Sequence, residues 1–253
     1  MPLYTAEALV LRTYKFGEAD RIVVFLTKDR GKKRGVARAA RRQRSRFQAG
    51  LEPLTRVEVA YFEREQRDLV GLNYAEALRS PLVGGDGSAL AYVGYFAELL
   101  DESVPEGDPS ERLFRLGASI VDAIAVGVPV RPLARYFEYW LLKLQGVYPS
   151  HQRCSCCGGL FDDGAAGAWL LAGEREFRCE GCACAGGPRG IALSPGALAF
   201  LEQAARVSPE RIGNVSYSDR LGRELQSAHR ALIAAHLEKE LRSIRVLRDM
   251  GEY

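Results

Sequence analysis

The stretch YTAEALVLRTYKFGEADRIVVFLT, residues 4–27, determines the fold more directly than any other part of the chain. Residues 4–13 are apolar, β-branched or aromatic at many positions, and residues 21–27 (RIVVFLT) are typical of a buried strand. Residues 16–20 (FGEAD) between them are typical of a turn. We therefore expect a β-hairpin here, with Tyr14 and Phe16 packed in the core rather than stacked on a nucleic-acid base.

Three more strands are expected downstream, over residues 32–39, 54–62 and 68–75. In the second of these, Val57, Val59 and Tyr61 alternate onto one face. Five short strands separated by turns predict a small barrel or sandwich.

The hydrophobic period changes after the glycine-rich residues 84–87, from the alternation of strands to the spacing of helices. Asp108 and Pro109 are typical of a helix start, Gly146 of a helix end, and Ser194 of an N-cap. The expected helices cover residues 89–102, 108–126, 131–145, 195–206 and 219–241. The chain is therefore predicted to be α+β.

All six cysteines lie between Cys154 and Cys184, which favours a metal site over a dispersed disulfide framework. The pairs Cys154/Cys157 and Cys179/Cys182 each have C-x-x-C spacing, which predicts four thiolate ligands for one structural zinc ion, Zn2+. Cys156 could replace either cysteine of the first pair, and Cys184 could replace Cys182. His151 is expected to be exposed rather than a ligand.

The segment between the two cysteine pairs has the length of a two-hairpin ribbon. Phe161, Trp169 and Phe177 would form its small apolar lining. The domain boundaries expected from these patterns are residues 1–80 for the β-domain, 81–148 with 191–253 for a helical domain, and 149–190 for the zinc ribbon.

Basic residues concentrate in residues 28–46, although the whole chain has a formal net charge of only +3. The segment holds ten cations and Asp29 as its single acid, which is the pattern of a phosphate-binding surface. Phe47 closes the segment and could stack a base or anchor the loop. The candidate DNA-binding residues are Lys28, Arg30, Lys32, Lys33, Arg34, Arg38, Arg41, Arg42, Arg44 and Arg46.

The remaining features argue against other classes of protein. No apolar run approaches the ~18 residues of a membrane span, and the first residues lack the pattern of a signal peptide, so a cytosolic location is expected. Neither a P-loop nor a dinucleotide-binding glycine motif occurs. Glu63, Glu65 and Asp68 are better explained as a polar strand end than as a nuclease site, and His229 and His236 as surface or core residues. We expect a DNA-binding protein without a catalytic site.

Several local motifs resemble the RecO family of bacterial DNA repair and recombination mediators. They are residues 8–14 (ALVLRTY), 17–22 (GEADRI), 35–42 (GVARAARR) with 45–47 (SRF), 51–54 (LEPL) and 146–149 (GVYP), together with the two C-x-x-C pairs. The resemblance covers most of the chain. Cys156 and Cys184 are extra to the family's four-cysteine pattern.

The resemblance implies a five-stranded N-terminal OB-fold β-barrel, followed by an α-helical domain with an inserted zinc ribbon. It also implies binding to single- and double-stranded DNA, annealing of complementary strands without ATP, and a cytoplasmic, nucleoid-associated location. The implied partners are RecR and the C-terminal tail of single-strand-binding protein, with help to RecA in loading onto coated strands. Arg131, Arg135 and Lys143 beside Trp140 are a candidate site for the acidic tail, although for any one of these residues a helix with an aromatic core face and solvated charges is the favoured explanation.

Two other classes compete with this hypothesis. One is an RNA-modifying enzyme built from an OB domain and a zinc ribbon, which would need a nucleophile or a cofactor loop. The other is an RNA-binding zinc-ribbon protein of transcription or of the ribosome. The candidate cations lie outside the ribbon, which favours contact with the nucleic-acid backbone.

Overall fold

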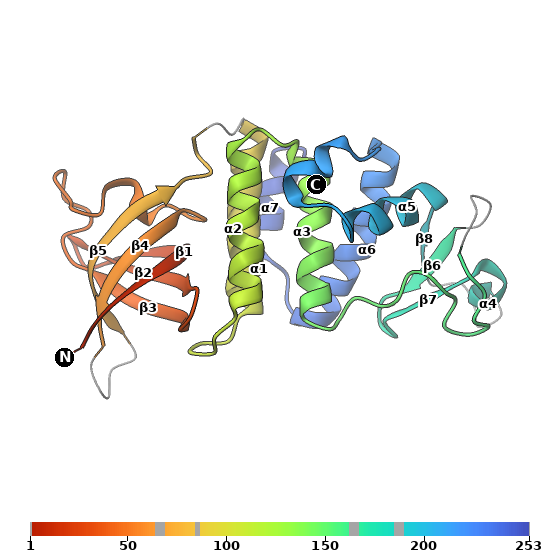
Figure 1. Cartoon of the computed structure of the whole chain (residues 1–253), viewed down its shortest axis with the longest axis horizontal. Helices are drawn as coiled ribbons and strands as arrows, with labels where there is room; N and C mark the ends of the chain where they lie inside the picture. The colour runs from red at the N-terminus through yellow and green to blue at the C-terminus, as the bar shows by residue number, and fades with distance from the viewer. Residues whose placement is uncertain (1, 64–68, 84–86, 162–166, 185–189, 253) are drawn as a thin grey trace. The chain divides into compact units, whose positions relative to one another are not determined.

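The N-terminal strands close into a barrel in the computed structural model of the chain (Figure 1). The structure describes residues 2–63, 69–83, 87–161, 167–184 and 190–252. The strands are β1 (Leu3–Phe16), β2 (Asp20–Thr27), β3 (Gly31–Ala37), β4 (Arg56–Phe62) and β5 (Val70–Arg79). They are joined in the order β1-β2-β3-β5-β4, with β3 and β5 parallel and the other pairs antiparallel. The predicted five-stranded barrel is confirmed.

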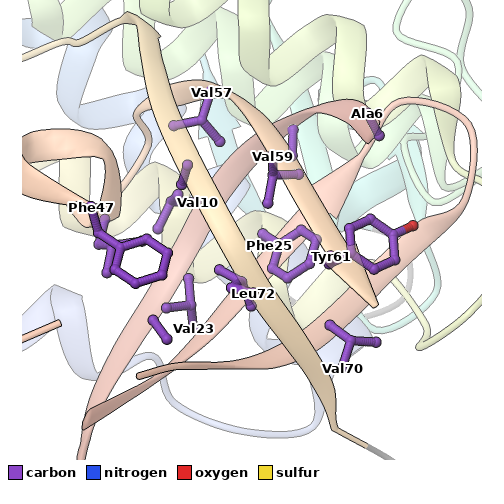
Figure 2. Packing of buried hydrophobic residues seen from close by; sticks show 14 residues of the cluster. Ala6, Val10, Val23, Phe25, Phe47, Val57, Val59, Tyr61, Val70 and Leu72 are labelled. Carbon is purple, nitrogen blue, oxygen red and sulfur yellow. The ribbon is translucent and has the colours of Figure 1, made fainter. Parts of the chain in front are cut away.

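Alternating side chains from these strands fill the inside of the barrel. Figure 2 shows Val10, Phe25, Val59 and Tyr61 pointing toward one another there, and all four are buried. The rings of Phe25 and Tyr61 meet edge to face with centroids 5.6 Å apart, a favoured aromatic geometry. The alternation expected over residues 54–62 therefore places its apolar face in this core.

The middle of β1 and of β2 is buried on the outer face as well. Helices α1 (Gly87–Ser103) and α2 (Glu111–Ala125) pack there, and Leu9 and Leu26 beneath them are fully buried. A Cβ at Gly117 would lie 2.7 Å from the Leu9 side chain, so the absence of a side chain at Gly117 allows α2 to pack this close to β1. Cover on both faces explains why residues 21–27 form a continuous apolar run instead of an alternating one.

A short last helix, α7 (Arg242–Asp249), packs against α1. Both oxygens of the Glu98 carboxylate accept backbone N–H bonds from Arg242 and Ser243 at 3.0 and 2.7 Å. A carboxylate at a helix N-terminus satisfies donors that would otherwise be unpaired and opposes the helix dipole. The barrel, α1, α2 and the residues from Leu241 on form one compact unit.

Residues 128–240 form a second compact unit. Helix α3 (Val130–Leu144) contacts α5 (Pro195–Ala204) and α6 (Asp219–Leu237), and the 3-10 helix η2 (Pro209–Asn214) lies against α3. A three-stranded sheet has the order β7-β6-β8, formed by β6 (Ala168–Leu171), β7 (Glu176–Arg178) and β8 (Ile191–Leu193), with the short helix α4 (Glu180–Cys184) after β7. The β6–β7 hairpin is one of the two hairpins expected in the ribbon, and β8 pairs with the other edge of β6.

Two helix boundaries differ from the prediction. Helix α2 begins at Glu111, and its N-cap is Ser110 rather than Asp108. The reason is that the Asp108 backbone packs against Gly31, where an added Cβ would lie 2.4 Å from the Asp108 backbone oxygen. The helix expected over 219–241 ends at Leu237, because Glu238 is left-handed with φ 53°. By contrast, Ser194 caps α5 through the Ala197 N–H, and Gly146 follows α3 with φ 70°, both as predicted.

No helix within the described ranges has the length and apolar character needed to cross a membrane. The domain boundaries expected at residues 80, 148 and 190 stay predictions.

Candidate nucleic-acid surface and metal centre

The basic segment runs from the turn after β2, through β3, into the loop that leads to the 3-10 helix η1 (Gln48–Leu51). Its ten cations fall into two groups with different surroundings. We call residues 28–34 the strand half and residues 38–46 the loop half.

Apart from Lys28, the cations of the strand half are engaged by acidic or aromatic residues. Lys32, with 11% of its side chain exposed, pairs with Asp101 at 3.2 Å and donates to the Asp101 backbone oxygen at 2.5 Å. Lys33 pairs with Glu63 at 2.7 Å, and Arg34 approaches Glu106 at 3.7 Å. Arg30 stacks over the Tyr4 ring at 4.0 Å. These contacts reduce the charge that the strand half can offer to a ligand.

The loop half is attached to the β1–β2 hairpin. Arg41 donates to the backbone oxygen of Glu18 at 2.8 Å, and the Ala39 N–H donates to the Asp20 carboxylate at 2.7 Å. Phe47 is buried in the barrel core beneath the guanidinium of Arg46, so of its two possible roles it has the anchoring one.

Four basic side chains of the segment remain available to a ligand. They are Lys28, Arg38, Arg42 and Arg44. All four are exposed, and none of them has a hydrogen bond or ion pair from its side chain to another residue in the part of the chain that is described. Three of the four belong to the loop half.

The tip of the β1–β2 hairpin carries functional candidates that the sequence had led us to place in the core. Tyr14 and Phe16 are 37% and 46% exposed, so the expectation that they pack in the core is wrong. Helices α1 and α2 do not bury this end of β1. Lys15 and Arg21 lie directly opposite each other in the register, an arrangement of like charges that costs stability unless an anion is near. The alternation of aromatic and basic residues over 14–16 is the signal that could have revealed this site.

The four cysteines of the two C-x-x-C pairs come together in the ribbon. The sulfurs of Cys154, Cys157, Cys179 and Cys182 all lie within 4.8 Å of one another. The Cys157 and Cys179 sulfurs are 3.9 Å apart, and a tetrahedral zinc ion with bonds of ~2.3 Å sets its sulfurs about 3.8 Å apart. Cys156 and Cys184 are exposed and lie outside this group. The geometry therefore suits a closed, four-coordinate metal site.

Backbone amides prepare one of these thiols for a metal. Burial on its own would raise the pKa of Cys154, but N–H donors of Cys157, Cys179 and Cys156 lower this pKa to about 6. Gly158 makes the tight turn next to Cys157 with φ 73°, and its N–H donates to the Cys154 oxygen. The thiolate is the form that binds metal, so the lowered pKa favours Cys154 as a metal ligand.

The apolar core beside the four cysteines is small. Phe177, Leu170 and Ala168 are buried, while Trp169 and Phe161 are only half-buried. Phe177 alone of the three expected aromatic residues is therefore a core residue.

The four-cysteine group includes none of the three histidines, all of which are described. His151 is half-buried against the rings of Tyr139 and Tyr148, and burial lowers its pKa, so the expectation of an exposed residue is wrong. His229 is fully buried, in agreement with one of the two expected roles. Glu63 pairs with Lys33, and Glu65 and Asp68 lie outside the described residues.

The candidate tail-binding residues of α3 differ in how far their side chains are buried. Arg135 is 2% exposed, and its Nη2 lies 2.9 Å from Glu138 Oε1, so this side chain cannot meet a ligand at the surface. Arg131 approaches Asp219 at 3.5 Å, and the Lys143 ammonium lies 4.9 Å from the Trp140 ring centroid. The set of three cations proposed from the sequence is therefore reduced to Arg131 and Lys143.

Comparison with known proteins covers nearly the whole chain. Residues 1–81 match the family model described as "Recombination protein O N terminal", and residues 84–245 match "Recombination protein O C terminal". The chain is 32% identical to the DNA repair protein RecO of Koribacter versatilis, over 97% of this chain and 98% of the relative. It is 35% identical to RecO of Anaeromyxobacter sp. strain K, over 96% and 95%, and 35% identical to RecO of Pelobacter propionicus, over 97% and 96%.

Proposed function

Because the chain belongs to the RecO family of DNA repair proteins, we propose that it is a mediator of DNA repair and recombination without catalytic activity of its own. It binds single- and double-stranded DNA, anneals complementary strands without ATP, and with RecR helps to load RecA onto strands coated by single-strand-binding protein. It acts in the cytoplasm, in association with the nucleoid. The family membership disfavours the alternative of an RNA-binding or RNA-modifying zinc-ribbon protein.

One observation carries the annealing proposal: the exposed cations Arg38, Arg42 and Arg44 lie in a loop that is bonded to the hairpin with the exposed rings of Tyr14 and Phe16. Cations in a loop neutralise phosphates, and exposed rings stack on bases of any sequence. Two complementary strands repel each other through their phosphates. A surface that neutralises one strand and keeps its bases accessible lowers this repulsion, and base pairing then supplies the driving force.

The direct test is annealing of two complementary oligonucleotides, followed by energy transfer in the absence of ATP. The strands are used bare and coated with single-strand-binding protein. We expect the triple variant Arg38→Glu, Arg42→Glu, Arg44→Glu to bind a single strand at least ~100-fold more weakly at low salt, because each lost phosphate contact removes a counterion-release contribution. Lys32 and Arg41 are left intact because their contacts support the fold.

A charge-matched control separates this surface from a general effect of net charge. Arg206, Arg211 and Arg223 are exposed residues of the helical unit, and their change to Glu alters the net charge equally. We expect this control to anneal at close to the wild-type rate. Equal loss of annealing in both triple variants would reject the loop as the DNA-binding surface.

The cofactor of the proposed function is one structural zinc ion, held by Cys154, Cys157, Cys179 and Cys182. A closed four-thiolate site offers no open position for a substrate, so the metal would stabilise the ribbon rather than activate water. We expect about one zinc per chain by elemental analysis, lost in Cys179→Ser and retained in the control Cys156→Ser, whose sulfur lies outside the group. Removal of zinc by a chelator should melt the ribbon, because its apolar core is small. Full zinc retention in Cys179→Ser would contradict the assignment.

The acidic tail of single-strand-binding protein is the remaining partner to test. Arg131 and Lys143 of α3 are exposed, and Lys143 lies beside Trp140. We expect Arg131→Glu with Lys143→Glu to weaken binding of a tail peptide while binding of a bare strand is unchanged. Unchanged peptide binding would remove α3 as the tail site.

A further inference from the structure

A cavity of about 420 Å³ lies in the first compact unit, and of the residues that line it only Arg21 was described above as part of the candidate DNA surface. Its walls come from β1 and β2, from the end of η1 and the two residues after it, from α1, and from the start of α7. Its volume falls in the range of pockets that bind small molecules. It is therefore large enough for a ligand the size of a nucleotide.

The wall combines an apolar surface with charged groups. Leu11, Leu51, Pro53 and Ala97 supply the apolar part. The charged residues are Arg12, Arg21, Arg242, Glu52 and Glu98.

Two of these charged residues are committed to structural contacts. Arg12 pairs with Asp101 at 2.8 Å, and Glu98 caps α7 with both oxygens. The guanidinium groups of Arg21 and Arg242 and the carboxylate of Glu52 have no hydrogen bond or ion pair with any described residue. The cavity thus offers two available cations and one available acceptor.

The cavity adjoins the proposed DNA surface. Arg21 on its wall lies opposite Lys15 in the hairpin and opposite Ala37 of β3. Arg12 donates to the Tyr14 hydroxyl at 3.0 Å, so the exposed ring of Tyr14 is held by a residue of the cavity wall. A strand that stacks on Tyr14 passes close to the cavity.

The charges of the wall decide which ligand fits. A nucleotide unit in a strand carries one phosphate charge, and its base presents donors as well as acceptors. The available groups match it: arginines for the phosphate, an apolar wall for the base, and Glu52 as acceptor for an exocyclic amino group. An acidic peptide presents several carboxylates and few donors, and Glu52 would repel it.

We propose that this cavity receives one base of the bound single strand, with preference for a base that carries an exocyclic amino group. The inference rests on the proposed function, since it requires that the strand be bound across the hairpin. A base removed from the stack in this way leaves its neighbours on Tyr14 and Phe16 accessible for pairing.

The test uses a short oligothymidylate that carries a single 2-aminopurine, whose fluorescence rises when it leaves the base stack. Gly94 lines the cavity and an added Cβ there meets no atom within 4 Å, so Gly94→Met adds a side chain at the cavity wall without a clash at its Cβ. Gly87→Met is the matched control, because Gly87 is on the same helix, also has open space around its Cβ, and does not line the cavity.

We expect a rise in fluorescence with wild type and Gly87→Met, loss of the rise with Gly94→Met, and strand affinity that is roughly fivefold lower in Gly94→Met. A second measurement compares oligocytidylate with oligothymidylate. Wild type should prefer oligocytidylate by about fivefold, and Glu52→Ala should lose that preference, since thymine has no amino group.

The outcomes separate this proposal from the proposed function. If wild type binds the strand and the fluorescence rise persists in Gly94→Met, or never occurs, the cavity proposal is overturned and the DNA surface stands. If wild type binds no strand, the proposed function fails and the cavity proposal fails with it. If a labelled aspartate-rich peptide binds wild type and Gly87→Met but not Gly94→Met, the cavity belongs to an acidic peptide and the proposal is overturned.

Discussion

Arginine occupies two contrasting environments in this chain, the exposed loop half of the basic segment and the interior of the helical unit. Arg38, Arg42 and Arg44 are exposed and have no partner among the residues described, whereas Arg135 is almost fully buried against Glu138. Glu138 in turn meets His229 Nδ1 at 2.9 Å, and the Tyr148 hydroxyl lies 3.0 Å from His229 Nε2. The contrast shows that the count of cations in a segment does not measure its capacity for DNA. Charge that is already satisfied stabilises the protein, and only the remainder is available to a ligand.

The largest effect is expected from Glu138→Ala. This change leaves the buried Arg135 without its carboxylate, and breaking a buried ion pair from one side costs about 3–5 kcal/mol of the free energy of unfolding. Urea unfolding of the full chain measures it, with the exposed Arg223→Ala as a control that should stay within about 0.5 kcal/mol of wild type. A loss below ~1 kcal/mol would mean that the buried cluster adds little to stability.

Lys32→Gln tests the strand half, which is intermediate between the two environments. Loss of its charged contacts with Asp101 should cost about 2 kcal/mol, because the pair is largely shielded from solvent. Strand affinity should change by less than about threefold, since this ammonium is already engaged. The opposite result, a large loss of affinity with unchanged stability, would assign Lys32 to the DNA surface.

The pH dependence of stability tests the buried cluster again. Burial lowers the pKa of His229 below its ordinary value of 6.5, although the Glu138 hydrogen bond opposes this shift. A group that is neutral in the fold but protonates in the unfolded chain stabilises fully above pH 6.5, and this stability is lost as the pH falls further. The melting temperature should therefore fall as the pH is lowered below 6.5. Burial also lowers the pKa of His151 and of His236, and both add to the drop, so a variant with His151→Gln and His236→Gln together isolates the part due to His229.

The smallest change in stability is expected for Arg42→Gln. The side chain is exposed and unpartnered among described residues, so unfolding should shift by no more than about 0.5 kcal/mol. Strand affinity at low salt should nevertheless fall by roughly fivefold, and the slope of log affinity against log salt should become shallower by about 0.7. An unchanged slope would show that Arg42 does not contact phosphate.

Local patterns in the sequence were sufficient to predict the barrel and the cysteine group. The alternation of Val57, Val59 and Tyr61 indicated which face is inside, and the C-x-x-C spacing indicated which four sulfurs meet. Both signals depend on residues close together in the chain.

Features that depend on distant contacts were not predictable in the same way. Lys32 meets Asp101, and Arg34 meets Glu106, across some seventy positions of sequence, so nothing local distinguishes them from the free cations of the loop. The exposure of Tyr14 and Phe16 depends on where the cover by α1 and α2 ends. Glu238, between α6 and α7, has a left-handed conformation that the sequence does not indicate, because the residue is neither glycine nor asparagine.

The return of the last helix to the first compact unit has a consequence for synthesis on the ribosome. Residues 128–240 emerge after the barrel and before α7, which at bacterial elongation rates delays α7 by on the order of ten seconds. Until then Glu98 lacks the backbone amides that it caps, and the face of α1 that α7 covers is open to solvent. The unit that carries the DNA surface is thus the first to begin folding and the last to be completed.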